Sequence, residues 1–70
     1  MQMQQVQSSN VRAVGYDPAS RLMRVEFSNG STYEYDDVSG GDFDSIVSSD
    51  SIGRSLRSVT MGRSYKRVDK

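Results

Sequence analysis

The sequence predicts an α+β fold, a three-stranded antiparallel meander covered by one or two short helices. Three observations lead to this prediction. Apolar and polar residues alternate in the first half of the chain, an Asn-Gly pair separates two alternating segments, and apolar residues recur at helical spacing after residue 40. The predicted strands span about residues 11–16, 21–28 and 31–36, and the predicted helices span about residues 40–48 and 50–58.

The hairpin between the second and third strands is the clearest local signal. Apolar side chains alternate with polar ones from Met23 to Phe27, and the alternation resumes at Tyr33 and Tyr35. Between them lies Asn29-Gly30, and both residue types tolerate the positive φ of a type I′ turn. The sequence therefore predicts two paired strands joined by a tight turn.

The first strand has an irregular pattern, because Val11 and Val14 are three residues apart instead of two. A β-bulge near Ala13 would bring both valines and Tyr16 to the same side of the sheet. The strand ends at Asp17-Pro18, where the proline presets φ for a turn and the aspartate can accept a backbone hydrogen bond. We therefore expect the three strands to pair in sequence order.

The helices are predicted from apolar residues that recur every three or four positions. The first set is Phe43, Ile46 and Val47, and the second set is Ile52, Leu56 and Val59. Gly53 lies within the second helix, where glycine costs up to ~1 kcal/mol relative to alanine, so a packing or contact reason for it is expected. The basic segment that follows is predicted to form a C-terminal arm or a closing edge strand.

The length of 70 residues suits one small domain, which we assign to residues 8–70. Residues 1–7 are predicted to be a polar N-terminal extension, either frayed or a short edge strand. Only 34% of the residues are apolar, so an isolated monomer is expected to be marginally stable. Self-association would bury additional surface, and a monomer and a homo-oligomer are both compatible with the sequence.

The residue types that most often carry chemistry are missing. The chain has no cysteine and no histidine, which removes the commonest metal ligands and the usual general base at neutral pH. The carboxylates of Asp36-Asp37, Asp42 and Asp44 suit turns and the first turn of a helix. We therefore expect a non-enzyme with no metal and no cofactor. No apolar run approaches the roughly 18 residues of a membrane span, so a cytoplasmic protein without a membrane partner is expected.

Charge is distributed unevenly along a chain whose formal net charge is zero. Residues 1–50 carry three arginines against eight acidic residues, a net charge of −5. Residues 51–70 carry six cations against one aspartate, a net charge of +5. A neutral chain argues against nucleic-acid binding by the whole surface, so any such binding is expected at the C-terminal segment.

The basic segment supplies most of the candidate ligand-binding residues. They are Arg54, Arg57, Arg63, Lys66 and Arg67, with Tyr65 among them. Arg54 and Arg57 are three residues apart and would share a helix face, and Ser51 would place a helix N-terminus nearby, which favours an anion. The alternative is a solvated segment whose charges balance the acidic half of the chain or of a neighbouring copy.

The tyrosines Tyr16, Tyr33 and Tyr35 complete the list of candidate residues. Tyrosines on one face of a sheet can stack on the bases of single-stranded RNA. The alternative, which we favour for Tyr33 and Tyr35, is packing under the helices, because a small meander needs its apolar face covered.

The order of several short motifs resembles the KTSC domain family. These motifs are Ser8-Ser9-Asn10-Val11, Val14-Gly15-Tyr16-Asp17, Leu22-Met23-Arg24-Val25-Glu26-Phe27, Gly30, Tyr33-Glu34-Tyr35, Asp37-Val38 and Ser51-Ile52-Gly53-Arg54. The resemblance covers about residues 8–67, and the central Tyr-x-Tyr is its hallmark. Ser39 stands where a proline commonly follows the Asp-Val pair, and Gly40-Gly41 loosens the same junction.

The resemblance implies a domain found at the C-terminus of some lysyl-tRNA synthetases and as a stand-alone bacterial or phage protein, for which RNA binding has been suggested. Two hypotheses follow. The first is a binding module for RNA or a small phosphorylated nucleotide. The second is a protein-interaction or self-assembly module, in which the basic segment meets an acidic surface of a partner or of another copy.

Overall fold

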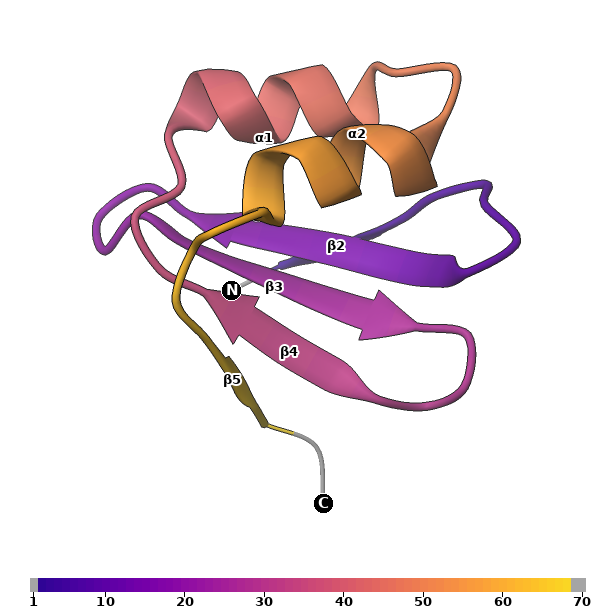
Figure 1. The fold of residues 1–70 in the computed structure, drawn as a ribbon, viewed down its shortest axis with the longest axis horizontal. Coiled ribbons are helices and arrows are strands. Elements are labelled where there is room, and N and C mark those ends of the chain that lie inside the picture. Colours follow the sequence, from indigo (N-terminus) through magenta and orange to yellow (C-terminus); the bar gives the residue numbers. More distant parts are fainter. Residues whose placement is uncertain (1, 69–70) are drawn as a thin grey trace.

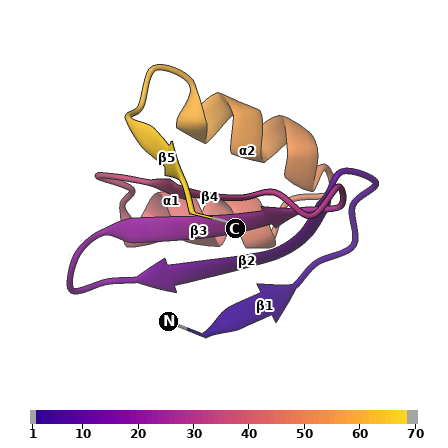
Figure 2. The same ribbon diagram turned by 90° about the horizontal axis from the view of Figure 1, so that it is seen from below.

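A sheet of five antiparallel strands carries two helices on one face (Figures 1 and 2). This architecture is taken from a computed structural model, which describes residues 2–68. The strands are β1 (Met3–Gln5), β2 (Val11–Asp17), β3 (Leu22–Phe27), β4 (Thr32–Tyr35) and β5 (Tyr65–Arg67), in the spatial order β1-β2-β3-β4-β5. The helices are α1 (Gly40–Val47) and α2 (Ile52–Thr60), which follow β4.

The predicted α+β class and the three central strands are confirmed, but the predicted sheet was too small. Two three-residue strands extend it at its edges. β1 pairs with β2 and comes from the segment predicted as a polar extension. β5 pairs with β4, so the basic segment forms the closing edge strand.

The irregularity in β2 lies where the sequence predicts it. The register between β2 and β3 shifts between Val11 and Ala13. As a result Val11 and Val14 both belong to the core cluster, and Tyr16 packs against the same cluster. The predicted β-bulge is confirmed.

The turn between β3 and β4 differs from the predicted type I′ turn. A type I′ turn needs positive φ at both central residues, but only Gly30, at φ 94°, has it. The backbone N–H of Gly30 donates to the carbonyl of Phe27, and the N–H of Phe27 donates to the carbonyl of Ser31. The Asn29 side chain accepts from the N–H of Ser31 at 2.9 Å. This is a longer loop, in which one left-handed glycine follows an ordinary turn.

The core lies between the helices and one face of the sheet. Its fully buried members include Val14, Met23 and Val25 from the strands and Ile46 from α1. Ile52 and Leu56 of α2 belong to the same cluster, and Phe43, Val47 and Val59 pack against it. The helical spacing in the sequence therefore identified the buried faces of both helices.

The two helices begin differently. The hydroxyl of Ser39 accepts a hydrogen bond from the N–H of Asp42 at 3.0 Å and caps α1. Ser51 stands at the same position before α2, but its side chain makes no capping hydrogen bond. The start of α2 therefore exposes N–H groups that the first turn of a helix leaves without backbone acceptors.

Candidate functional site

The open start of α2 faces the loop between β1 and β2. Together they form a pocket of about 560 Å³, lined by residues 7–10, residues 50–54 and Arg57. We call this the α2 pocket. Its walls come from segments at least 40 positions apart in the sequence, and they meet because β2 and α2 both pack on the same core. Of the predicted site residues, the α2 pocket brings together Ser51, Arg54 and Arg57.

Arg54 and Arg57 are the cations of this pocket, and both side chains are exposed. Within residues 2–68 neither guanidinium makes an ion pair or a hydrogen bond. Every other cation in that range has a partner. A guanidinium presents five N–H donors in a fixed fork, a geometry that matches a phosphate or a carboxylate. The two arginines therefore offer unused donors beside an uncapped helix N-terminus.

The electrostatic character of the α2 pocket is positive but mixed. The start of α2 carries a partial positive charge, and its first turn contains no acidic residue. Asp50 lies at the wall of the pocket and is exposed. A carboxylate there repels an anion close to it but accepts hydrogen bonds from hydroxyl groups. The α2 pocket thus places one carboxylate beside two guanidinium groups and a helix N-terminus.

Gly53 opens the floor of this pocket. A Cβ atom added there would meet nothing within 4 Å, and its φ does not lie in the left-handed region. Neither packing nor backbone conformation therefore requires glycine at this position. Glycine in a helix is destabilising relative to alanine. The packing reason expected from the sequence is not found, and Gly53 lines the α2 pocket.

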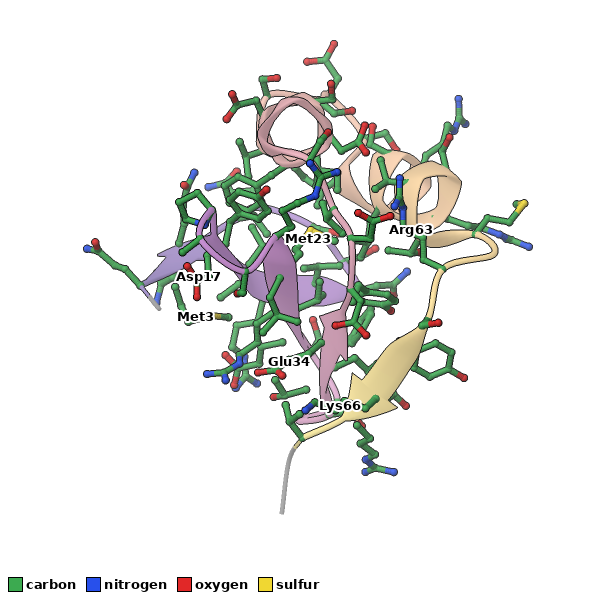
Figure 3. The ribbon with its side chains drawn as sticks, turned by 90° about the vertical axis from the view of Figure 1, so that its left-hand side faces the viewer. Met3, Asp17, Met23, Glu34, Arg63 and Lys66 are labelled. Carbon is green, nitrogen blue, oxygen red and sulfur yellow. The ribbon has the colours of Figure 1, made fainter. Side chains whose placement is uncertain are left out.

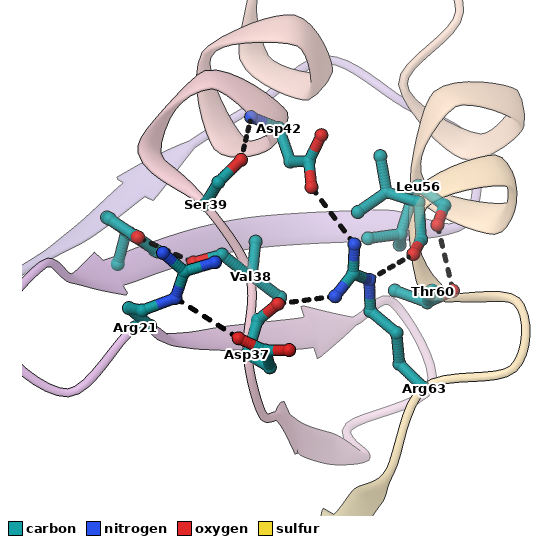
Figure 4. Close-up of polar contacts among 10 residues, drawn as sticks. Arg21, Asp37, Val38, Ser39, Asp42, Leu56, Thr60 and Arg63 are labelled. Carbon is teal, nitrogen blue, oxygen red and sulfur yellow. Dashed lines mark hydrogen bonds and ion pairs between the residues drawn. The ribbon is translucent and has the colours of Figure 1, made fainter.

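Arg63 has a different role, shown in Figure 4. Its Nε donates to the carbonyl of Val59 at 2.6 Å, and its Nη1 donates to the carbonyl of Asp37. Its Nη2 pairs with the carboxylate of Asp42 at 3.1 Å. Arg63 thus ties the end of α2 to the turn after β4 and to the start of α1. The structure does not bring it to the α2 pocket.

Lys66 lies on the sheet face away from the helices, as Figure 3 shows. Its Nζ is 3.8 Å from Oε1 of Glu34, whose other oxygen accepts from Nε of Arg24 at 2.8 Å. The three residues stand side by side on β3, β4 and β5. Only 7% of the Glu34 side chain is exposed, so both cations compensate a largely buried carboxylate. Neither Lys66 nor its neighbour Arg67 lines the α2 pocket.

Four aromatic rings form a continuous row beside α2. Tyr33 lies edge-on to Phe27 and to Tyr65, each with centroids 5.6 Å apart, and Tyr65 also lies 5.8 Å from Tyr35. Tyr35 is buried in the core, whereas Tyr33 is half-buried. Burial raises the pKa of Tyr35, and the neighbouring Tyr33 and Tyr65 raise the pKa further. The packing interpretation thus holds for Tyr35, and Tyr33 both packs and remains accessible.

Tyr16 is placed apart from these rings. It stacks on Phe43 with centroids 5.2 Å apart, and its hydroxyl donates to the carbonyl of Val38 at 2.6 Å. Both contacts hold the segment that includes Val38 and the start of α1 against β2. The tyrosines predicted as one set are therefore divided between two regions.

The described residues contain no cluster of three or more His, Cys, Asp or Glu side chains that could hold a metal ion. Across residues 2–68, neither helix is long and apolar enough to cross a membrane.

Sequence reasoning missed several residues of the α2 pocket. Ser8, Ser9 and Asn10 of the β1–β2 loop and Asp50 were not among the candidates, and Gly53 was noted without a role. The motifs Ser8-Ser9-Asn10-Val11 and Ser51-Ile52-Gly53-Arg54 had been recognised separately. Because a polar loop carries no signal of what it faces, only the fold shows that these motifs adjoin.

The chain belongs to the KTSC domain family. The model of this family, the KTSC domain, matches residues 7–65. The crystal structure of a KTSC domain protein from Yersinia pestis superimposes with a TM-score of 0.88 at 32% sequence identity, covering 96% of each chain. The family resemblance expected from the sequence is confirmed.

Two bacterial proteins are similar to this chain over most of their length. An uncharacterised protein of Stutzerimonas stutzeri is 36% identical over 66 residues, which cover 91% of this chain and 93% of the relative. A protein of Tsukamurella paurometabola is 38% identical over 61 residues, which cover 87% of this chain and 91% of the relative.

Proposed function

We propose that this KTSC domain is a small non-catalytic module that binds RNA or a small phosphorylated nucleotide, with the phosphate at the α2 pocket. The observation that carries the proposal is the pair Arg54 and Arg57, whose guanidinium groups have no partner within residues 2–68 and both line this pocket. Two arginines one helical turn apart, neither with a partner, offer a bidentate phosphate site.

The start of α2 adds to this site. Its first N–H groups lack backbone acceptors, and Ser51 supplies no side-chain cap. A phosphate oxygen can accept from these groups while the helix dipole favours its charge. Arg63 and Lys66 of the basic segment pair with carboxylates of the protein itself, so the proposed site is narrower than the whole basic segment.

The test begins with the purified protein. The chain has no tryptophan, so bound nucleotide or RNA gives a clear excess of absorbance at 260 nm over 280 nm, and mass spectrometry of the denatured sample identifies it. Binding of a short single-stranded RNA is then titrated at several salt concentrations. Affinity is expected to fall with salt, because each neutralised phosphate releases counterions.

Substitutions locate the site. Arg54→Gln and Arg57→Gln are each expected to lower affinity roughly tenfold, the size of one charge-assisted hydrogen bond. Arg21→Gln is the matched control, because Arg21 is also exposed and its loss changes the net charge equally, but it pairs with Asp37 outside the pocket. Equal losses in all three variants, or no loss in any, would refute the α2 pocket as the phosphate site.

A second candidate function is a protein-interaction or self-assembly module. One observation favours it: Met61 and Tyr65 are large apolar side chains that are 72% and 64% exposed, and Tyr65 lies on the edge strand β5. Exposed apolar side chains beside an open sheet edge are typical of contact surfaces. Sedimentation at increasing protein concentration tests this function. A mass that stays that of the monomer in low salt would exclude self-assembly.

A further inference from the structure

A second pocket lies at the β3–β4 hairpin, beside the α2 pocket. It has a volume of about 480 Å³ and is lined by Asn10, Phe27, Ser28, Asn29, Ser31 and Tyr33. We call this the aromatic pocket. The half-buried rings of Phe27 and Tyr33 line it and meet edge to face, with centroids 5.6 Å apart.

The two pockets adjoin at Asn10, which lines both. A smaller crevice of about 210 Å³ lies between α2 and the sheet and connects them further. It shares Gly53 and Arg57 with the α2 pocket and Phe27 with the aromatic pocket. One concave surface therefore runs from two unpaired arginines to two aromatic rings.

Two side-chain amides at the aromatic pocket, those of Asn10 and Asn29, can form hydrogen bonds with the edge of a flat polar ring. The side-chain amide of Asn10 makes no hydrogen bond within residues 2–68, so both its N–H donors and its oxygen acceptor are unused. Asn29 uses its side-chain oxygen on the N–H of Ser31, and no bond within the same range occupies its NH₂ group. Aromatic rings beside amide donors and acceptors are the groups that hold a nucleobase by stacking and by its edge.

We propose that the aromatic pocket binds the base of a nucleotide whose phosphate lies in the α2 pocket. This inference rests on the proposed function and specifies it: Phe27 and Tyr33 contact the base, and Asn10, at the boundary, hydrogen-bonds the base edge. The shared chemistry is a nucleotide unit, either free or within a single strand of RNA. Of the tyrosines in the row, Tyr33 is the one that contacts the base.

The first experiment compares two probes that differ only in the base. Ribose 5-phosphate and adenosine 5′-monophosphate are titrated into the full chain, and binding is followed by NMR chemical shifts of the backbone amides. Stacking contributes about 1–3 kcal/mol per base, so the nucleotide is expected to bind at least about fivefold more tightly. Its additional shifts are expected at residues 27–33. Equal affinities would overturn the base pocket.

Two matched variants locate the base. Phe27→Leu keeps an apolar side chain but removes the ring, and it is expected to abolish the advantage of the nucleotide over ribose 5-phosphate. Phe43→Leu makes the same change at a ring that stacks on Tyr16 outside the pocket, and it is expected to leave the advantage intact. An advantage that survives Phe27→Leu would place the base elsewhere and overturn the inference. Asn10→Ala tests the edge contact without changing a ring.

The outcomes separate this inference from the proposed function. If both probes bind equally and Arg57→Gln weakens both, the phosphate site stands and the base pocket is excluded. If neither probe nor a trinucleotide of single-stranded RNA binds, the proposed function fails as well. A trinucleotide that binds much more tightly than the mononucleotide identifies RNA as the source of the nucleotide unit, and equal affinity identifies a free nucleotide.

Discussion

The two ends of α2 use the same residue type in opposite ways. At the C-terminal end, Arg63 returns to the helix and donates to the carbonyl of Val59, to the carbonyl of Asp37 and to the carboxylate of Asp42. At the N-terminal end, Arg54 and Arg57 donate to nothing within residues 2–68, and Ser51 leaves the first turn uncapped. One end is closed by the protein itself, and the other is open.

This difference separates structural cations from candidate binding cations. Donors that already have acceptors contribute to the free energy of unfolding and have little left to offer a ligand. Donors without acceptors contribute little to stability, because the unfolded chain solvates them equally well, but they are available for binding. The sequence gives all three arginines the same appearance, and the contacts distinguish them.

The largest expected effect is on the free energy of unfolding, when an arginine with partners and an arginine without partners are each replaced by alanine. Arg63→Ala is expected to lower the free energy of unfolding by about 2 kcal/mol, because it leaves the carbonyls and the carboxylate without their partner. Arg54→Ala is expected to change it by less than about 0.5 kcal/mol, as is usual for an exposed side chain without contacts. Urea unfolding followed by circular dichroism measures both. Similar losses of unfolding free energy in the two variants would contradict the distinction between structural and candidate binding arginines.

The strands were predictable where side chains alternate, and they were left as one of two alternatives where only the backbone pairs. β3 and β4 follow from the alternation around Val25 and Tyr33, because burial on one face imposes a period of two. The edge strands β1 and β5 are three residues long and bury no side chain, so the sequence offered each only as one of two alternatives, and the pairing with β2 and β4 decides for the strand. The predicted type I′ turn was wrong. Asn29 does not have the positive φ that this turn needs, and its side chain instead accepts a hydrogen bond from the backbone N–H of Ser31.

The candidate site was predictable where its residues lie on one helix, and not where they meet only through the fold. Helical spacing placed Arg54 and Arg57 on one face, and both line the pocket. Ser8 and Asn10 lie more than 40 positions away, and their approach to α2 depends on how β2 and α2 pack on the core. Arg63 was grouped with Arg54 and Arg57, but the structure pairs it with Val59, Asp37 and Asp42, because a cation near a helix end carries no sign of which carbonyls it will meet.

A smaller effect is expected from the serines that precede the two helices. Ser39→Ala removes the hydroxyl that accepts from the N–H of Asp42, and loss of such a cap costs about 1 kcal/mol. Ser51→Ala removes a hydroxyl that caps nothing in α2, so stability is expected to change by a few tenths of a kcal/mol at most. Thermal unfolding of the two variants side by side measures the difference. A Ser51 variant as destabilised as the Ser39 variant would show that the start of α2 is closed after all.

A small change in stability is also expected at Gly53, and it has the opposite sign. Gly53→Ala places a methyl group where nothing lies within 4 Å, at a φ that alanine accepts, so the free energy of unfolding is expected to rise by about 0.5 kcal/mol. Gly53 also lines the α2 pocket, so the added methyl group narrows the space that the proposed phosphate enters. Affinity for single-stranded RNA is therefore expected to fall several-fold while the protein becomes more stable.

This opposition of signs is informative, because a substitution that merely damages the fold lowers stability and binding together. A variant that is more stable and binds less well indicates a glycine retained for access to the helix backbone. Ser58→Ala, an exposed change near the other end of α2, is the control and is expected to leave affinity unchanged. If Gly53→Ala raises stability and leaves affinity intact, the phosphate lies over Arg54 and Arg57 without reaching the first turn, and the open end of α2 has no part in binding.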